Sequence, residues 1–249
     1  HSTSRRQRQM CIRDRDTAWM KYVEACTIES KATTEPADIK IEVARGGEYK
    51  IRLEDGTTVW LNSESSLIYP EKFTGDKRAV RLSGEGYFEV ARDEKKPFIV
   101  SVTDMEIKVL GTKFNVTAYQ DEKMTTTTLI SGAVEVVTPH RSVQLQPGKQ
   151  AMVQEGGDDI TVLEVDVELA TSWTAGIFKF DKMALTDICT RLSRWYDIDF
   201  VFEGETGKEK FTGGTWKYVP LKDFLSKIER VTNVLFLFEN NTVKVVPKK

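Results

Sequence analysis

The sequence has few of the residues from which metal sites and disulfide frameworks are usually built. Its 249 residues include two histidines, His1 and His140, and three cysteines, Cys11, Cys26 and Cys189. An odd number of cysteines without CxxC spacing excludes a disulfide framework or a zinc ribbon as an organising feature, and a histidine-based zinc site needs two or three such ligands. His140 stands in the segment TPHRS, which is typical of a solvated turn. We therefore expect no metal site and no cofactor.

The sequence also lacks an excess of charge, a long apolar run and a nucleophile motif. Lys and Arg together number 36 and Asp and Glu 38, for a net charge of −2, which gives no electrostatic case for binding nucleic acid or an anionic membrane. No run of 18 apolar residues occurs, so the chain as given contains no predicted membrane span. Neither a phosphate-binding loop nor a Gly-x-Ser-x-Gly elbow is present. We expect a protein that is not an enzyme.

The first residues are unlike the rest of the chain. HSTSRRQRQMCIRDR, residues 1–15, is basic and has no apolar segment of the kind a signal peptide requires. It resembles translated adapter sequence, in which case the natural chain begins near Asp16 and Cys11 has no meaning. The other interpretation is a disordered basic tail. Residues 1–40 are therefore set aside as a disordered or artefactual segment.

From Ile41 to about Val167 the apolar residues alternate with a period of two, which predicts β-strands. Five copies of one unit occur, in which two alternating apolar residues precede a short glycine-containing turn and two more follow it. The turns lie at Asp55-Gly56, SGEG (83–86), GT (111–112), SG (131–132) and PG (147–148). The spacing between copies shrinks along the chain, so a strict solenoid does not follow. The pattern predicts either a meander of hairpins or an irregular β-helix-like stack.

The stretch LEDGTTVWLNSESSL, residues 53–67, gathers serines and carboxylates and so raises the question of a catalytic cluster. Glu54 and Asp55 occupy the same place as the other glycine turns, and polar residues follow the second strand, where they satisfy loose backbone groups. No histidine or lysine lies nearby to activate a hydroxyl. The stretch is typical of the corner of a sheet.

Near residues 166–174 the pattern changes to alternating strands and helices. Two segments, residues 185–203 and 221–239, each show a helical spacing followed by an alternating strand, and they align without a gap at an offset of 36 residues. The leading strands are GIFKF and FTGGTWKY, and a last strand, Val243 to Val246, follows the hairpin signal ENNT. We expect a small domain made of a duplicated βαβ unit. Cys189 lies on the apolar face of the first helix, which predicts a buried residue and not a reactive thiol.

Five segments then occur in order: LEDGTTVWLNSESSLIYPEKF, RLSGEGYFEVARDEKKPFIV, VLGTKFNVTAY, LISGAVEV and LQPGKQA. They resemble successive blocks of the FecR family of periplasmic anti-sigma regulators. The later segments AGIFKFDKMALTDICTRLSRWYDIDFVFE and FTGGTWKYVPLKDFLSKIERVTNVLFLF are similar to the C-terminal domain of the Bacteroidetes type, which is related to the short N-terminal domain of secretins and TonB-dependent transporters. The resemblance runs from about Ile41 to Val246. It predicts a FecR-like β domain over 41–167 and the related small domain over 168–249.

The resemblance implies a signalling protein of the inner membrane. Such regulators hold an extracytoplasmic-function sigma factor through a cytoplasmic segment, cross the membrane once, and present both domains to the periplasm. There they contact the signalling domain of a TonB-dependent outer-membrane transporter. The cytoplasmic segment and the span are absent from this sequence, so sigma-factor binding is carried onto no residue here. The short linker near residues 168–174 predicts limited hinge freedom between the domains.

The open edges of a small sheet predict where a partner strand would pair. The last strand follows a hairpin, which makes it a candidate edge strand, and two aromatic residues could anchor a partner there. The predicted partner-binding residues are Trp216, Tyr218, Thr242, Val243, Lys244 and Val245.

Two other functions stay open from the residues alone. A carbohydrate-binding β module of a glycan-uptake system could use Trp60, Tyr69 or Tyr87 as sugar platforms. A glycan-acting enzyme needs two carboxylates about 5–10 Å apart, for which Glu85 and Glu89 are candidates by residue type alone. Sugar titration followed by tryptophan fluorescence separates the carbohydrate-binding module from a protein-binding scaffold.

Overall fold

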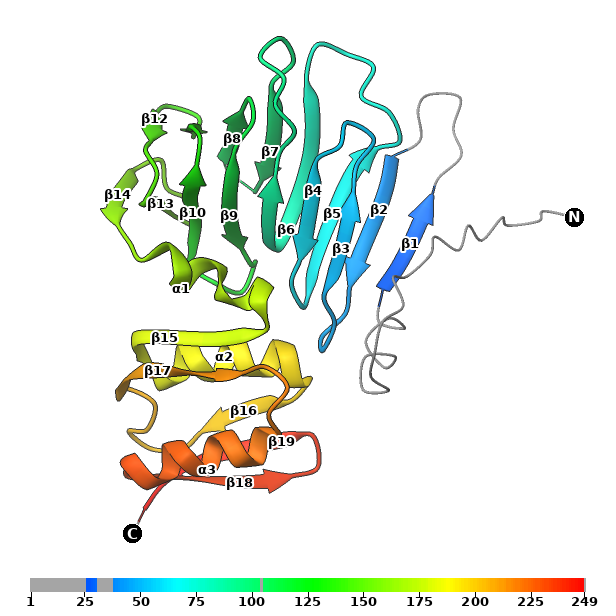
Figure 1. Cartoon of the computed structure of the whole chain (residues 1–249). Helices are drawn as coiled ribbons and strands as arrows, with labels where there is room; N and C mark the ends of the chain where they lie inside the picture. Colours follow the sequence, from blue (N-terminus) through cyan, green and yellow to red (C-terminus); the bar gives the residue numbers. More distant parts are fainter. Residues whose placement is uncertain (1–25, 31–37, 104, 249) are drawn as a thin grey trace, which may run out of the picture.

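The computed structural model describes residues 26–30, 38–103 and 105–248. Two parts lie one above the other in Figure 1, a large all-β part and a smaller part with helices that ends at the C-terminus. Each has its own hydrophobic core, one formed by residues between Ile41 and Val153 and the other by residues between Phe178 and Val245. We call them the β domain and the C-terminal domain. The boundaries expected at residues 40 and 167 stay predictions, and the expectations about residues 1–15 fall outside the described residues.

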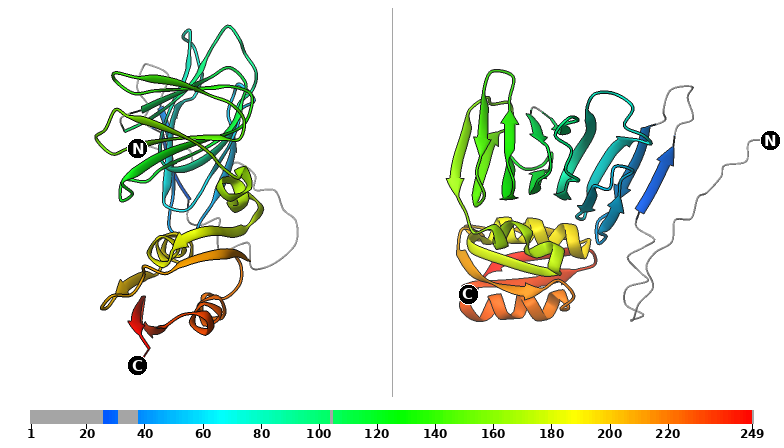
Figure 2. Two further views of the ribbon diagram at one scale, coloured as in Figure 1. Left: turned by 90° about the vertical axis from the view of Figure 1, so that its left-hand side faces the viewer. Right: turned by 45° about the horizontal axis from the view of Figure 1, so that its top comes forward.

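The β domain consists of two facing layers of strands that share one strand (Figure 2, left). The first layer has the order β1 (Cys26–Ser30), β2 (Asp38–Val43), β5 (Ser65–Pro70), β6 (Arg78–Glu89), β7 (Phe98–Val102), β8 (Met105–Val109), β11 (Val134–Val137) and β12 (Ser142–Leu145). The second has the order β3 (Tyr49–Arg52), β4 (Thr58–Leu61), β6, β9 (Lys113–Ala118), β10 (Met124–Ser131), β13 (Lys149–Gln154) and β14 (Ile160–Glu164). All neighbours are antiparallel except β6 and β7. The prediction of a mainly β chain is confirmed.

The shared strand β6 corrects one prediction. The segment SGEG was expected to be a turn, but β6 runs through it without a break: its first half pairs with β5 and β7, and its second half with β4 and β9. Gly84 has a φ of +91° at the point where the strand passes from one layer to the other. A Cβ at Gly84 would lie 2.7 Å from the Cα of Ser65. Glycine is required here for a bend and for close backbone approach, and not for a reversal of the chain.

Three further glycine turns also differ from the expected hairpins. At GT, SG and PG the chain crosses from one layer to the other, because β8, β11 and β12 belong to the first layer and β9, β10 and β13 to the second. Five hairpins that were not predicted join β5 to β6, β7 to β8, β9 to β10, β11 to β12 and β13 to β14. Only Asp55-Gly56 is a hairpin as predicted, between β3 and β4. In this part of the chain, the predicted repeating unit was therefore displaced by half a unit relative to the hairpins of the structure.

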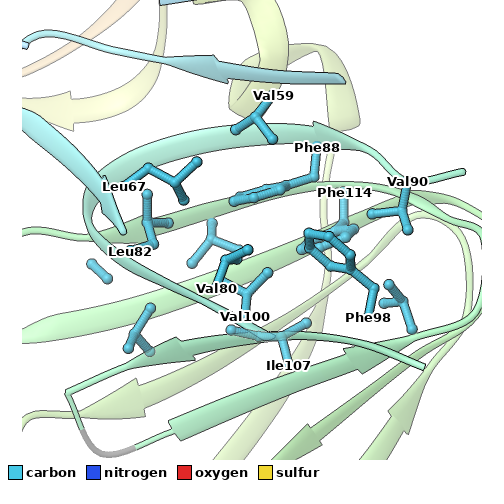
Figure 3. Close-up of a cluster of buried hydrophobic side chains, with 14 of the residues drawn as sticks. Val59, Leu67, Val80, Leu82, Phe88, Val90, Phe98, Val100, Ile107 and Phe114 are labelled. Carbon is cyan, nitrogen blue, oxygen red and sulfur yellow. The ribbon is translucent and has the colours of Figure 1, made fainter. Parts of the chain in front are cut away.

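The core of the β domain lies between the layers, where the inward side chains of both meet (Figure 3). Phe88, from the shared strand, stacks on Phe114 with 5.0 Å between ring centroids and lies 6.3 Å from Phe98. All three side chains are fully buried. Aromatic pairs at these distances are stabilising beyond the area that they bury, and this cluster packs between the two layers.

A short segment connects the two domains. It contains α1 (Val167–Thr171) and the 3-10 helix η3 (Ser172–Ala175). Figure 1 shows α1 at the lower margin of the β domain, next to the first strand of the C-terminal domain. Within the described residues, no helix has the length and hydropathy that crossing a membrane requires.

The C-terminal domain contains two small sheets and two helices. Its elements are β15 (Ile177–Ala184), α2 (Leu185–Tyr196), β16 (Asp199–Phe202), β17 (Lys210–Trp216), α3 (Leu221–Val231), β18 (Val234–Glu239) and β19 (Thr242–Pro247). β15 pairs with β17, and β19 lies between β16 and β18. The helices begin at Leu185 and Leu221, which are related by the offset seen in the sequence. The duplication itself stays a prediction. Cys189 is buried in this core, as expected.

Candidate partner-binding edge and domain junction

The last strand is not the edge strand that the sequence suggested. β19 pairs in parallel with β16 on one side and antiparallel with β18 on the other, so both of its edges are occupied. Val243 and Val245 are fully buried, while Thr242 and Lys244 lie on the opposite face. The hairpin signal correctly placed β19 beside β18, but the parallel pairing with β16 is long-range and left no local signal. A partner strand cannot pair with β19 in this fold.

Trp216 and Tyr218 lie elsewhere, at the end of β17. Trp216 is 61% exposed and Tyr218 47% exposed. Tyr218 contacts the Trp195 ring edge-on with 5.8 Å between centroids, and its hydroxyl donates to Glu48 of the β domain at 3.4 Å. The two aromatic residues are therefore accessible, as an anchor requires, but they flank the two-stranded sheet and not β19.

β17 has an open edge. Among the described residues its only strand partner is β15. The Lys217 N–H donates to the Gly176 carbonyl at 2.9 Å, and backbone groups alternate in direction along an antiparallel pair. The backbone N–H groups of Gly214 and Trp216 consequently point away from β15. This edge offers donors to an added strand next to an exposed tryptophan.

The next residue, Lys217, points into the junction between the domains. Its side chain is fully buried, and its Nζ lies 2.9 Å from Glu48 Oε2 and 3.4 Å from Asn62 Oδ1 of the β domain. The same ammonium lies 3.9 Å from the centroid of the Trp195 ring. Burial lowers the pKa of Lys217, while the nearby Glu48 opposes this shift. A buried ammonium needs these partners, because an unpaired buried charge is strongly destabilising.

Arg194, in the last turn of α2, is the second cation of the junction. Its guanidinium donates to Asp121 Oδ1 at 2.6 Å and to Glu122 Oε1 at 2.5 Å, in the hairpin between β9 and β10. Its Nε lies 3.5 Å from Glu64 Oε2. Although Arg194 belongs to the C-terminal domain, only 4% of it is exposed. Arg194 occupies the side of the junction that Lys217 does not reach.

The loop between β2 and β3, residues 44–48, receives most of the remaining contacts. Arg45 donates to Asp199 Oδ1 at 2.9 Å and to the Ile198 carbonyl at 3.2 Å. The Gly46 N–H donates to the Arg194 carbonyl at 2.7 Å. Together with the Glu48 carboxylate, three positions of this short loop bind the C-terminal domain.

The connecting segment is packed against the β domain. Trp173 is buried, and its indole N–H donates to Asn115 Oδ1 of β9 at 3.1 Å. Lys179 of β15 donates to Glu168 of α1 at 2.7 Å. Hinge freedom in this segment stays a prediction, but hinge motion would have to break the buried contact of Trp173.

The residues of the two alternative functions occupy ordinary structural positions. Tyr69 is buried and cannot be a sugar platform. Trp60 is half-buried, with Tyr87 edge-on at 5.3 Å and the Lys50 Nζ 4.2 Å from its ring centroid, so one of its faces is already covered.

The two candidate carboxylates are each bound by neighbouring side chains. Glu85 accepts from Asn62 at 2.7 Å and from Asn115 at 3.0 Å. Glu89 pairs with Lys113 at 2.9 Å. Cross-strand contacts of this kind are the normal means of sheet stabilisation.

Few features of the sequence predict the junction. In the alternation of the predicted strand, Lys217 falls on the same inward-facing side as Phe211 and Thr215. A charged residue at such a position could have indicated a buried contact with another part of the chain. Arg194 and Trp173 carried no such signal, because both contact residues far away in the chain.

A β domain of two layers, joined through a buried junction to a small domain with two helices, defines the structural class of this chain. The same arrangement is found in two crystal structures of a proposed anti-sigma factor from Parabacteroides distasonis ATCC 8503. The structure at 1.65 Å resolution matches with a TM-score of 0.78 and 30% identity, over 84% of this chain and 99% of the other. The structure at 2.50 Å matches with a TM-score of 0.79 and 30% identity, over 85% and 100%.

Residues 39–135 match the FecR protein family, and residues 177–245 match the family described as FecR, C-terminal. The chain belongs to the FecR family. No curated protein matches it.

Proposed function

We propose that this chain is the periplasmic part of an anti-sigma regulator, anchored at the inner membrane, which relays a signal from a TonB-dependent outer-membrane transporter to an extracytoplasmic-function sigma factor. The observation that carries the proposal is that both FecR family matches fall on the two domains of one chain. The likeness to a proposed anti-sigma factor, over nearly the whole length of the chain in its crystal structure, supports it. In this proposal the sigma factor binds a cytoplasmic segment that is not among the described residues.

The transporter's signalling domain binds, in this proposal, at the open edge of β17. Strand addition uses main-chain hydrogen bonds for affinity and side-chain contacts for specificity. The outward N–H groups of Gly214 and Trp216 supply the first, and the exposed Trp216 ring supplies the second. Tryptophan is one of the residue types enriched among those that dominate the binding energy of an interface. The predicted site at Thr242, Val243, Lys244 and Val245 is replaced by this edge.

Calorimetric titration of the chain with the periplasmic signalling domain of a TonB-dependent transporter encoded beside its gene tests the proposal. We expect saturable binding, and a loss of about tenfold or more in affinity for Trp216→Ala, as for a central aromatic anchor. Val231→Ala is the matched control, because Val231 is a 74% exposed apolar residue on α3 and not on this edge. Absence of heat at high concentration, with the protein folded, would contradict the proposal. An equal loss for both variants would contradict the location of the site.

A further inference from the structure

Trp216, the last residue of β17, and Lys217, which directly follows it, face two different surroundings. The side chain of Trp216 is exposed beside the open edge, and the side chain of Lys217 is buried in the domain junction. Successive side chains of a strand point to opposite faces. A strand that binds the edge and shifts β17 therefore moves Lys217 as well.

Lys217 transmits such a shift to only a few groups. Its ammonium is held by Glu48 and Asn62 of the β domain and by the ring of Trp195 in its own domain. The rings of Trp173 and Phe178 lie 5.7 and 5.9 Å away. Because an unpaired buried ammonium is strongly destabilising, a shift of Lys217 favours a matching shift of Glu48.

Glu48 lies at the end of the loop that follows β2. The same loop holds Arg45 and Gly46, which bind Asp199 and the Arg194 carbonyl. β1 in turn pairs along its whole length with β2, with Cys26 opposite Val43. The loop thus connects the junction directly to the pair of strands nearest the N-terminal end of the chain.

We propose that the Lys217–Glu48 contact couples the open edge of β17 to the loop between β2 and β3, and through it to the β1–β2 pair. Lys217 is a positioning residue in this scheme, and it does not touch the partner. The identity of the strand that binds the edge rests on the proposed function, but the coupling is a property of this chain alone. Coupling between two sites is reciprocal. Loss of the contact therefore alters both the edge and the loop.

Hydrogen exchange on the unliganded chain tests the coupling without any partner. In Lys217→Met, which keeps the length of the side chain and removes its charge, we expect about fivefold or faster exchange, at the lower end of typical coupling, in residues 44–48, in β2 and in β17. Lys179→Met is the matched control, since Lys179 forms an exposed ion pair on the adjacent strand β15. Glu48→Gln, the milder change at the other end of the contact, should act in the same direction. Protection of β9 reports that each variant is folded.

Unchanged exchange in the loop of a folded Lys217→Met or Glu48→Gln variant would overturn the proposal. Adding the transporter's signalling domain gives a second result that is separate from the first. In the wild type, binding should alter exchange in residues 44–48, and in Lys217→Met the same binding should leave the loop unaltered. If no signalling domain binds but the variants still accelerate exchange in the loop, the proposed function fails and the coupling stands. If binding alters the loop equally in both proteins, the coupling does not pass through Lys217 and the inference is wrong.

Discussion

The guanidinium carbon of Arg194 lies 3.6 Å from the centroid of the Tyr119 ring, across the boundary between the two domains. The Tyr119 hydroxyl donates to the Ser63 carbonyl at 2.9 Å, which fixes the ring in the β domain. The ring therefore stacks on a cation whose N–H groups bind carboxylates in the hairpin that follows Tyr119. An aromatic face and an acidic hairpin together let an arginine be buried between domains at an acceptable electrostatic cost.

The first prediction concerns this pair. We expect a double-mutant cycle of Arg194→Met and Tyr119→Leu to give a coupling energy of about 1 kcal/mol, the middle of the range for partly desolvated cation–π pairs. The three carboxylates that pair with Arg194 are partly exposed, so solvent screens their contribution to stability. Urea unfolding of the four proteins measures the coupling. Arg191→Met, an exposed arginine on the same helix, should change stability by no more than about 0.5 kcal/mol.

The second prediction is a pH dependence that arises from Lys217. Its pKa in the folded protein is lower than its ordinary value of 10.5, chiefly because of burial. Between the lowered pKa and 10.5 the unfolded chain binds the proton and the folded chain does not, so stability rises with pH in this window. Below the window both states are protonated, and the folded state bears the full cost of the buried charge.

The measurement for this second prediction is the difference in unfolding free energy between the wild type and Lys217→Met, taken at a series of alkaline pH values. The subtraction removes the titration of the other groups. The difference should move in favour of the wild type as the pH approaches 10.5. A difference that moves against the wild type over this window would show that the folded pKa is raised.

The third prediction compares two glycines of the β domain. Gly84→Ala should destabilise the protein by about 2–4 kcal/mol, because the backbone has a φ of +91° and the new Cβ would meet Ser65. Gly75→Ala should be close to neutral, since no heavy atom lies within 4 Å of the Cβ position there. Thermal unfolding of both variants gives the comparison. Similar melting temperatures for the two would mean that the bend in β6 does not need glycine.

The fourth prediction concerns the thiol of Cys189. Burial raises the pKa of this thiol, so the reactive thiolate is scarce and enclosed. In a chain whose Cys11 and Cys26 are replaced by serine, we expect no reaction with a disulfide reagent on the time scale that modifies a free cysteine, and complete reaction in denaturant. Rapid labelling of the folded chain would show that α2 opens locally.

Much of the β domain could be predicted from alternation alone, because a two-layered domain buries one face of each strand. Val59, Leu61, Phe88 and Val116 stand at alternating apolar positions of the predicted strands, and all four are buried. The glycine turns could not be resolved, since a hairpin, a crossing between layers and a bend within a strand all call for a residue without a Cβ. The distinction depends on which strands pair. The residues of a turn do not indicate pairing between strands that are far apart in the sequence.

The candidate site was less predictable for a related reason. Arg194 and Arg230 occupy equivalent positions in the aligned segments, yet Arg194 is buried at the junction and Arg230 is exposed. Helical spacing treats them alike, because the difference comes from the β domain, which lies against only one of the two helices. Trp216 could be identified from the sequence as an aromatic residue near an edge. Which strand forms that edge became clear only from the position of β19 in the structure.

β6 has a mechanical consequence for the β domain. Sheets that are connected only by loops can slide over one another, since side-chain packing resists shear weakly compared with hydrogen-bonded pairing. Here one twelve-residue strand is paired within both sheets, so sliding would require breaking ladders on both sides of Gly84. The domain should therefore respond to force as a stiff block. A displacement applied at its lower margin would move the two layers together instead of sliding one over the other.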